Sequence, residues 1–80
     1  MNPKDVKISL GNIEKLARHM HQGLECLLIL KGSIDLEING VVSRMKQDDL
    51  VVINSNEVHS IDGNKSNIVL TLYVAKDYMQ

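Results

Sequence analysis

Apolar and polar positions alternate strictly in the middle of the chain, where residues 33–39 read SIDLEIN. The three aliphatic side chains share one face of an extended strand and the two acids share the other, as in a strand with one solvated side. Asn39-Gly40 follows, a dipeptide that tolerates positive φ at both central positions of a type I′ turn. The pattern therefore predicts a hairpin in which 41–45 forms the return strand.

Further strands are predicted where aliphatic residues are dense. Leu24 to Leu30 is apolar apart from Glu25 and ends at Lys31-Gly32. Val6 to Arg18 begins with alternation and continues with a helix-like spacing, which predicts a short strand and then a turn or brief helix. Three more strands are expected, at Leu50–Ile53, Val58–Ile61 and Ile68–Val74. The intervening turns are Lys46–Asp49, Asn54–Glu57 and Asp62–Asn67.

Short strands separated by turns, without a long helix, predict an all-β sandwich or barrel. Eighty residues set the limit at one domain with a small core. Phe and Trp are absent and Tyr occurs twice, so the core must be packed from Leu, Ile, Val and Met. The aliphatic side chains expected inside include Leu27, Ile29, Ile53 and Leu70.

The charge balance argues against one large class of function. Nine Lys and Arg stand against ten Asp and Glu, and the basic residues are scattered, so this chain itself is not expected to contact nucleic acid. The longest apolar run, Cys26–Leu30, is too short to span a bilayer, and the N-terminus lacks the apolar region of a signal peptide. The lone cysteine, Cys26, agrees with a reducing compartment and is interpreted as a buried small hydrophobe. The sequence predicts a cytoplasmic protein without membrane contact.

Two of the three histidines, His19 and His21, stand two positions apart. On an extended strand, positions i and i+2 lie on one face about 6.6 Å apart, so both imidazoles reach one ion at ~2.1 Å. Glu25 has the same parity and is a lone charge in an apolar strand, which a divalent cation, a basic ligand group or solvent would compensate. In a barrel, the short strand after the 54–57 turn brings His59 opposite this pair.

These four residues form the candidate metal site. Nitrogen and oxygen ligands favour Zn, Fe, Mn, Ni or Cu over Ca or Mg, and the sequence does not identify the metal. The alternative is that His19 and His21 are exposed polar residues flanking the core. Catalytic residues are unknown, because no Ser-His-Asp or Cys-His nucleophile arrangement is present; if the protein is an enzyme, metal-assisted chemistry is the route.

The same residues carry a resemblance to the cupin superfamily. Its first motif is H-x-H, three residues, E, six residues and G, and the chain matches it over 19–32, with Gly32 in the last place. The resemblance implies one cupin domain over 1–80. Its fold would be a small barrel of the double-stranded β-helix or jelly-roll type, with His19, His21, Glu25 and His59 around the mouth.

The second cupin motif is expected over 48–63. The chain keeps its acidic turn at Asp48 and its metal-ligating histidine at His59. It departs from the pattern at three places, which are Asn54 in place of Pro, Asn56 in place of Gly and Gly63 in place of Asn.

Residues 18–79 resemble, more narrowly, the N-terminal sensor domain of AraC-type transcription regulators. The similarity lies in the H-x-H, the N-G hairpin, the segment INSNEVHSI and the last apolar strand. It implies a domain that binds a small-molecule effector, helps to form a homodimer and influences two helix-turn-helix units downstream of Gln80. Such relatives can also keep the metal-site residues and bind their effector without a stable ion.

Two other functions stay open. A free-standing small metal-dependent cupin enzyme, dioxygenase-like or isomerase-like, would bind a substrate at the same residues. A structural or dimerisation module would leave the cavity empty. Exposed edge strands in so short a chain also favour self-association, because unpaired backbone groups invite a partner.

Overall fold

The structure is a computed structural model, and it describes residues 6–63 and 66–75. This part of the chain forms strands and no helix, which confirms the predicted all-β class. The strands are β1 (Val6–Gly11), β2 (Lys15–His19), β3 (Gly23–Ile38), β4 (Val41–Lys46), β5 (Leu50–Ile53), β6 (His59–Asp62) and β7 (Asn67–Ala75). The turn predicted at 62–67 lies partly outside the described residues.

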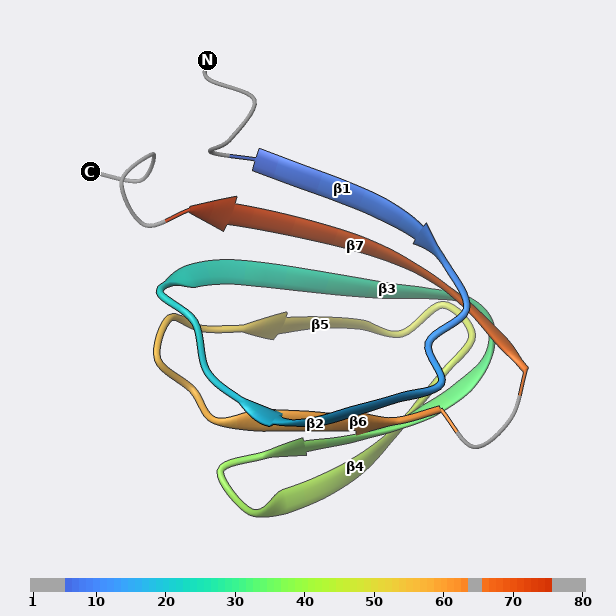
Figure 1. Cartoon of the computed structure of the whole chain (residues 1–80). Helices are drawn as coiled ribbons and strands as arrows, with labels where there is room; N and C mark the ends of the chain where they lie inside the picture. Colours follow the sequence, from blue (N-terminus) through green and yellow to red (C-terminus); the bar gives the residue numbers. More distant parts are fainter. Residues whose placement is uncertain (1–5, 64–65, 76–80) are drawn as a thin grey trace.

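The strands form two facing layers that share β3 (Figure 1). The upper layer holds β1, β7, the first half of β3 and β5, in that order and all antiparallel. The lower layer holds β2, β6, the second half of β3 and β4. Among the described strands β1 pairs with β7 alone, so the first and last strands lie side by side.

β3 passes from one layer to the other through a bend at Gly32. Its pairing with β7 shifts register just before this residue, and Gly32 takes a φ of 75°. A side chain here would collide with the backbone carbonyl of Ser66. The prediction of separate strands at 24–30 and 33–39 is therefore wrong: they are one bent strand, because the pairing with β7 ends at Gly32 and the pairing with β4 begins at the next residue, Ser33.

Replacing Gly32 with alanine is expected to lower the free energy of unfolding by about 2–4 kcal/mol, because a Cβ adds a backbone collision to a left-handed conformation. Gly40 is the matched control: its φ is 84°, and a Cβ there meets nothing within 4 Å. Gly40→Ala should lower the free energy of unfolding by about 1–2 kcal/mol, which is the cost of the left-handed conformation without a collision. Urea unfolding followed by circular dichroism measures both variants, and equal losses would contradict the role given to the bend.

The predicted hairpin is confirmed in the lower layer. Ile38 and Val41 are partners across the turn, and Asn39 and Gly40 both have positive φ, at 50° and 84°. The alternation before the turn also holds. The aliphatic side chains at 34 and 36 are buried between the layers, while the acids at 35 and 37 lie on the outer face.

The prediction over 6–18 is right in part: the short strand is β1 and a link at 12–14 follows it, but no helix forms there and the chain continues as β2. This edge strand pairs with β6, and its register shifts between Leu16 and His19. Leu16 is the partner of Ile61 and His19 is the partner of His59, so residues three apart in β2 face the same side. A β-bulge adds one residue to a strand in this way, and the resulting spacing imitates that of a helix.

The core lies between the layers and is aliphatic, as predicted. Its buried apolar side chains are Leu27, Ile29, Ile34, Leu36, Ile53, Ile61 and Val69. Leu70, expected inside, is instead half-buried on the outer face of the upper layer, because its neighbour Val69 takes the inward position. Cys26 is half-buried on the same outer face, where its cross-strand neighbours are Leu72 and Val52.

A buried amide joins β7 to the segment between β1 and β2. Asn67 is 3% exposed, and its side chain makes two hydrogen bonds to the backbone of Ile13. The Ile13 amide donates to Asn67 Oδ1 at 2.9 Å, and Asn67 Nδ2 donates to the Ile13 carbonyl at 2.8 Å. The Asn67 backbone amide also donates to Asn12 Oδ1 at 3.1 Å. This contact fixes where β2 begins.

Candidate metal centre

His59 is the most deeply placed histidine, with a side chain that is 0% exposed at the start of β6. Its Nδ1 lies 2.9 Å from the carbonyl oxygen of Glu57. Because a carbonyl only accepts hydrogen bonds, Nδ1 carries the proton and Nε2 presents a lone pair. Nε2 is buried and has no hydrogen-bond partner among the described residues. The ring is therefore oriented as a metal-ligating histidine is, with its other nitrogen held by a carbonyl.

His19 ends β2 and faces His59 directly across the lower layer. Their ring centroids are 4.2 Å apart. The His19 Nδ1 lies 2.9 Å from the carbonyl of Ala17, so the same argument leaves its Nε2 as an acceptor. The bulge in β2 gives His19 its inward direction, since regular alternation from Leu16 would turn it outward.

His21 lies in the link between β2 and β3, so the predicted pair on one regular strand is wrong in its local structure: β2 ends at His19. The backbone amide of Asn56 donates to the His21 carbonyl at 2.9 Å, which ties this link to the turn before β6. The His21 ring centroid is 5.0 Å from that of His59 and 5.1 Å from that of Tyr73. Both of its ring nitrogens are buried without a hydrogen-bond partner in the described chain.

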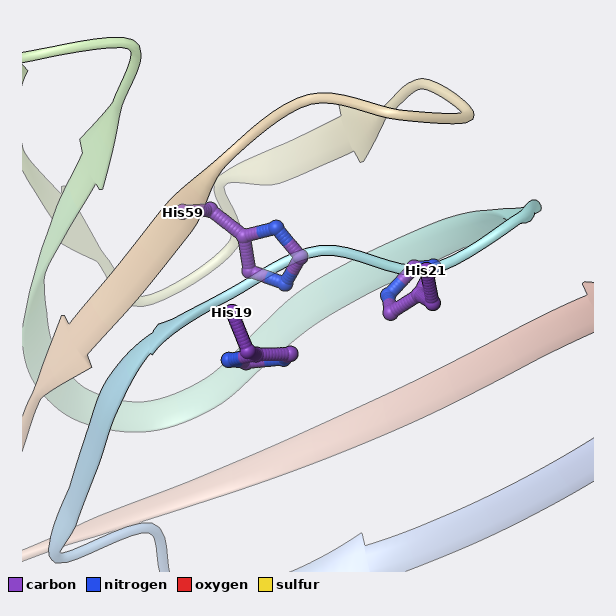
Figure 2. A group of neighbouring side chains, drawn as sticks. All are labelled: His19, His21 and His59. Atoms are coloured by element: carbon purple, nitrogen blue, oxygen red, sulfur yellow. The ribbon is translucent and has the colours of Figure 1, made fainter.

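The three imidazoles, from the end of β2, the link that follows it and the start of β6, thus gather at one point (Figure 2). One nitrogen from each of His19, His21 and His59 lies within 4.8 Å of the other two. Ligands at ~2.1 Å from a shared ion stand roughly 3.0–3.4 Å from each other, so small side-chain rotations would close the site. Three neutral nitrogen donors suit a transition metal.

Glu25 faces the same cluster from β3. Its Oε2 is 3.7 Å from His21 Nε2 and its Oε1 is 3.9 Å from His59 Nε2, and its side chain is 16% exposed. Both distances are longer than a hydrogen bond. When the His59 ring is neutral, its Nε2 lone pair and the carboxylate face each other with no donor between them, an arrangement that a cation would stabilise. Glu25 as a fourth ligand stays a prediction.

The turn at 54–57 supports two of the three histidines. Its Asn56 amide holds the His21 carbonyl, and its Glu57 carbonyl holds the His59 ring. Asn56 has a φ of 67°, a left-handed conformation that asparagine tolerates better than most residues. The departure from the cupin pattern at Asn56, where glycine is usual, thus replaces one residue suited to positive φ with another.

A cavity of about 380 Å³ opens beside the histidines on the inner side of the upper layer. Its lining residues are Lys7, Ser9, His21, Glu25, Thr71 and Tyr73. The Tyr73 ring leans over Gly23, where an added Cβ would lie 2.6 Å from the ring, and it meets His21 edge-on. Of the lining residues only His21 and Glu25 were predicted, and the signal for Lys7 and Ser9 is weak, but Thr71 and Tyr73 could have been found. Their signal is that they are polar residues two apart in the otherwise aliphatic segment IVLTLYV.

A second hollow lies on the outer face of the lower layer and is lined by paired charges. Arg18 contacts Glu37 at 2.7 Å, and Arg44 contacts Asp35 at 2.9 Å. The hydrogen bond from Arg18 holds the pKa of Glu37 below its usual value. Because Asp35 and Glu37 already have partners and no histidine is among the lining residues, this hollow is not the candidate site.

Comparison with known proteins adds a family and a set of solved structures. The sequence model of the family described as "Cupin domain" matches residues 8–75. No curated protein matches the chain. Within the described residues no helix has the length and apolarity that crossing a bilayer requires.

Three solved structures illustrate the similarity. A conserved protein of Streptococcus pyogenes has a TM-score of 0.81 and 19% identity, over 89% of this chain and 65% of that one. A cupin superfamily protein of Desulfitobacterium hafniense has a TM-score of 0.83 and 19% identity, over 94% of this chain and 72% of that one. The Cnp3 cupin domain of Schizosaccharomyces pombe has a TM-score of 0.85 and 14% identity, over 99% of this chain and 62% of that one. The chain therefore spans less than two thirds of the first and third of these chains, and the likeness shows the fold alone.

Proposed function

Because this chain belongs to the cupin family, we propose that it is a metal-binding domain that senses a small molecule for a cytoplasmic transcription regulator of the AraC type. The observation that carries the proposal is the cluster of buried, unpartnered imidazole nitrogens beside a cavity of about 380 Å³. That volume lies at the small end of the range for ligand pockets, which runs from about 300 to 1,000 Å³. The cavity therefore suits a small molecule.

Two sets of residues at this site have different expected roles in binding. His19, His21 and His59 would hold a divalent ion such as Zn, Fe, Mn, Ni or Cu, with Glu25 as the expected fourth ligand. A metal bound there would supply a Lewis-acidic position for an oxygen of the effector. On the upper layer next to His21, Tyr73 and the neighbouring hydroxyl groups would donate hydrogen bonds and fix the orientation of the effector.

Effector binding would act on the domain through its longest strand. Glu25 lies in the part of β3 that belongs to the upper layer, and the cavity is completed by β1 and β7 on that layer. A ligand in the cavity therefore contacts three adjacent strands and stabilises their pairing by mass action. In a regulator, this added order would be the signal passed to the DNA-binding units.

Two measurements test the proposal. Purified chain is expected to bind one Zn²⁺ or Mn²⁺ per molecule and to melt at a higher temperature when loaded, because the ion binds only the folded cluster. The reading frame beyond Gln80 is expected to encode two helix-turn-helix units. A chain that stays metal-free and melts unchanged after metal addition would contradict the binding site, and a stop codon directly after Gln80 would contradict the regulator.

A metal-dependent enzyme, dioxygenase-like or isomerase-like, is the second candidate. The observation that favours it is that Glu25 and Tyr73, two groups able to transfer protons, line the cavity next to His21. Steady turnover of a substrate by the metal-loaded chain would favour the enzyme. Saturable binding without turnover would favour the sensor.

A further inference from the structure

The cavity wall formed by the upper layer, which adjoins His21, has a regular composition that follows from the strand register. One row across the upper layer runs from Lys7 to Tyr73 to Glu25. The next row inward runs from Ser9 to Thr71, and both of these hydroxyl groups line the cavity. The inner face of the upper layer is therefore polar near the histidines, and it becomes aliphatic farther along the strands.

Lys7 is the cation of this wall. Among the described residues it forms no ion pair, since the ion pairs found there join other side chains. In this row Tyr73 stands between Lys7 and Glu25. The Cα atoms of Lys7 and Glu25 are therefore two strands apart, about 10 Å. Lys7 therefore lines the cavity at a distance from Glu25 at which the two charges do not form an ion pair.

The charge balance of the cavity favours an anion. Three neutral imidazoles and Glu25 around a divalent ion leave a net charge near +1, and Lys7 raises it to about +2. Resting on the metal-binding function proposed above, we infer that the ligand is a small hydroxycarboxylate. Its carboxylate binds Lys7 with help from Ser9 and Thr71, and its other oxygen lies toward the histidine cluster.

The inference predicts a charge-dependent ligand preference. Malate and lactate are the probes, and their neutral amides, malamide and lactamide, are the matched controls. With Zn²⁺-loaded chain, at least one acid is expected to bind and to raise the melting temperature, while its amide binds at least 10-fold more weakly. This difference reflects the greater strength of hydrogen bonds to a charged group.

Lys7→Met should weaken binding of the acid about 10-fold or more and leave Zn²⁺ affinity unchanged. Lys15→Met is the control, because Lys15 lies on β2 away from this cavity. Equal binding of acid and amide, or unchanged binding in Lys7→Met, would overturn the inference while the metal site stands. Increased self-association in Lys7→Met without loss of acid binding would show instead that this lysine protects an edge strand. Failure of Zn²⁺ to bind at all would count against the proposed function.

A second inference rests on the outer face of the upper layer, which is apolar from edge to edge. One cross-strand row consists of Ile8, Leu72, Cys26 and Val52. The next runs from Leu10 on β1 to Leu50 on β5 through two further leucines. Ile8 is 70% exposed, and Leu10 and Leu50 are each 64% exposed. No charged side chain interrupts either row.

The outer face of the lower layer shows what a solvated face of this fold looks like. There β3 places Asp35 and Glu37 outward, and both pair with arginines. Apart from Glu25 on the inner face, the same strand is apolar on both faces in the upper layer, and such runs are typical of strands buried on both sides. Strand and side-chain spacing give this apolar face a projection of roughly 20 by 20 Å. A contiguous apolar surface of this size marks an interaction site.

We propose that the apolar face binds the same face of a second copy of this chain. A face without charges needs no complementary charges on its partner, so it fits itself across a two-fold axis. Homodimer interfaces are the more apolar class and resemble a core cut in half. The two upper layers would then stack about 10 Å apart, as in a sandwich.

Sedimentation equilibrium tests this contact. The chain is expected to be a dimer at micromolar concentration, and Leu50→Arg is expected to be a monomer. Val42→Arg is the matched control, because Val42 is 63% exposed on the lower layer and should leave the dimer intact. Leu10→Arg, at the other end of the same row, is the second variant if Leu50→Arg does not fold.

The thiol of Cys26 gives an independent readout, because it lies in the middle of the apolar face. Its reaction with a thiol reagent should be slow in the dimer and faster on dilution or in Leu50→Arg. A chain that is monomeric at 100 µM, or a Leu50→Arg variant that stays dimeric, would overturn the proposal. Dimerisation only when a longer version of the protein is used would show that another segment covers this face.

Discussion

His59→Gln is expected to lower the affinity of the chain for Zn²⁺ on the order of 100-fold or more, and to abolish the rise in melting temperature on metal addition. The reason is geometric. His59 is fully buried, and its Nδ1 is fixed by the Glu57 carbonyl. Its Nε2 has no hydrogen-bond partner among the described residues, which leaves it available to an ion. Competition with a chromophoric chelator measures the affinity, and circular dichroism measures the melting temperature.

A pair of carboxylate variants provides the control for this prediction. Glu25→Gln, which removes the charge facing His21 and His59, should weaken Zn²⁺ binding about 10-fold or more. Glu37→Gln removes a charge of the same kind from the outer face, where its partner is Arg18, and should leave Zn²⁺ binding unchanged. Equal affinities in wild type, His59→Gln and Glu25→Gln would refute the candidate metal centre.

Asn67→Ala is expected to lower the free energy of unfolding by about 2–4 kcal/mol. The substitution leaves the backbone amide and carbonyl of Ile13 without the two side-chain partners that now satisfy them. The melting temperature should fall by more than 8 °C, since about 1 kcal/mol corresponds to 4–8 °C in a domain of this size.

Asn12→Ala is the graded comparison for this loss, because it removes one exposed acceptor for the Asn67 amide. It should cost about 1 kcal/mol. Chemical unfolding in urea gives both values. A loss in Asn67→Ala no larger than that in Asn12→Ala would show that water replaces the buried amide without cost.

Local signals in the sequence were sufficient for much of the fold. The alternation at 33–39 and the Asn39-Gly40 dipeptide specify a hairpin by themselves, because side-chain direction and turn type are properties of neighbouring residues. Features that depend on pairing between distant strands were not legible. The bulge in β2 and the bend at Gly32 both arise from registers with β6 and β7. From the residues alone, a turn or brief helix was predicted at the bulge and the end of a strand was predicted at Gly32.

The residues of the candidate site were predictable from the sequence, but the backbone features that bring them together were not. Histidine spacing and Glu25 pointed to the cluster, yet the gathering of His19, His21 and His59 depends on a bulge, a link and a turn. The direction of β7 was also hidden, because aliphatic residues occupy both of its faces. For this reason Leu70 was expected inside and Tyr73 was overlooked.

The pairing of the first strand with the last has a consequence for synthesis on the ribosome. β1 leaves the exit tunnel early, but its partner β7 ends only at Ala75. Until then β1 exposes a backbone edge and the aliphatic side chains of Ile8 and Leu10. The nascent polypeptide is therefore most vulnerable to aggregation during this interval, and chaperones that shield emerging hydrophobic segments should increase the yield of native protein.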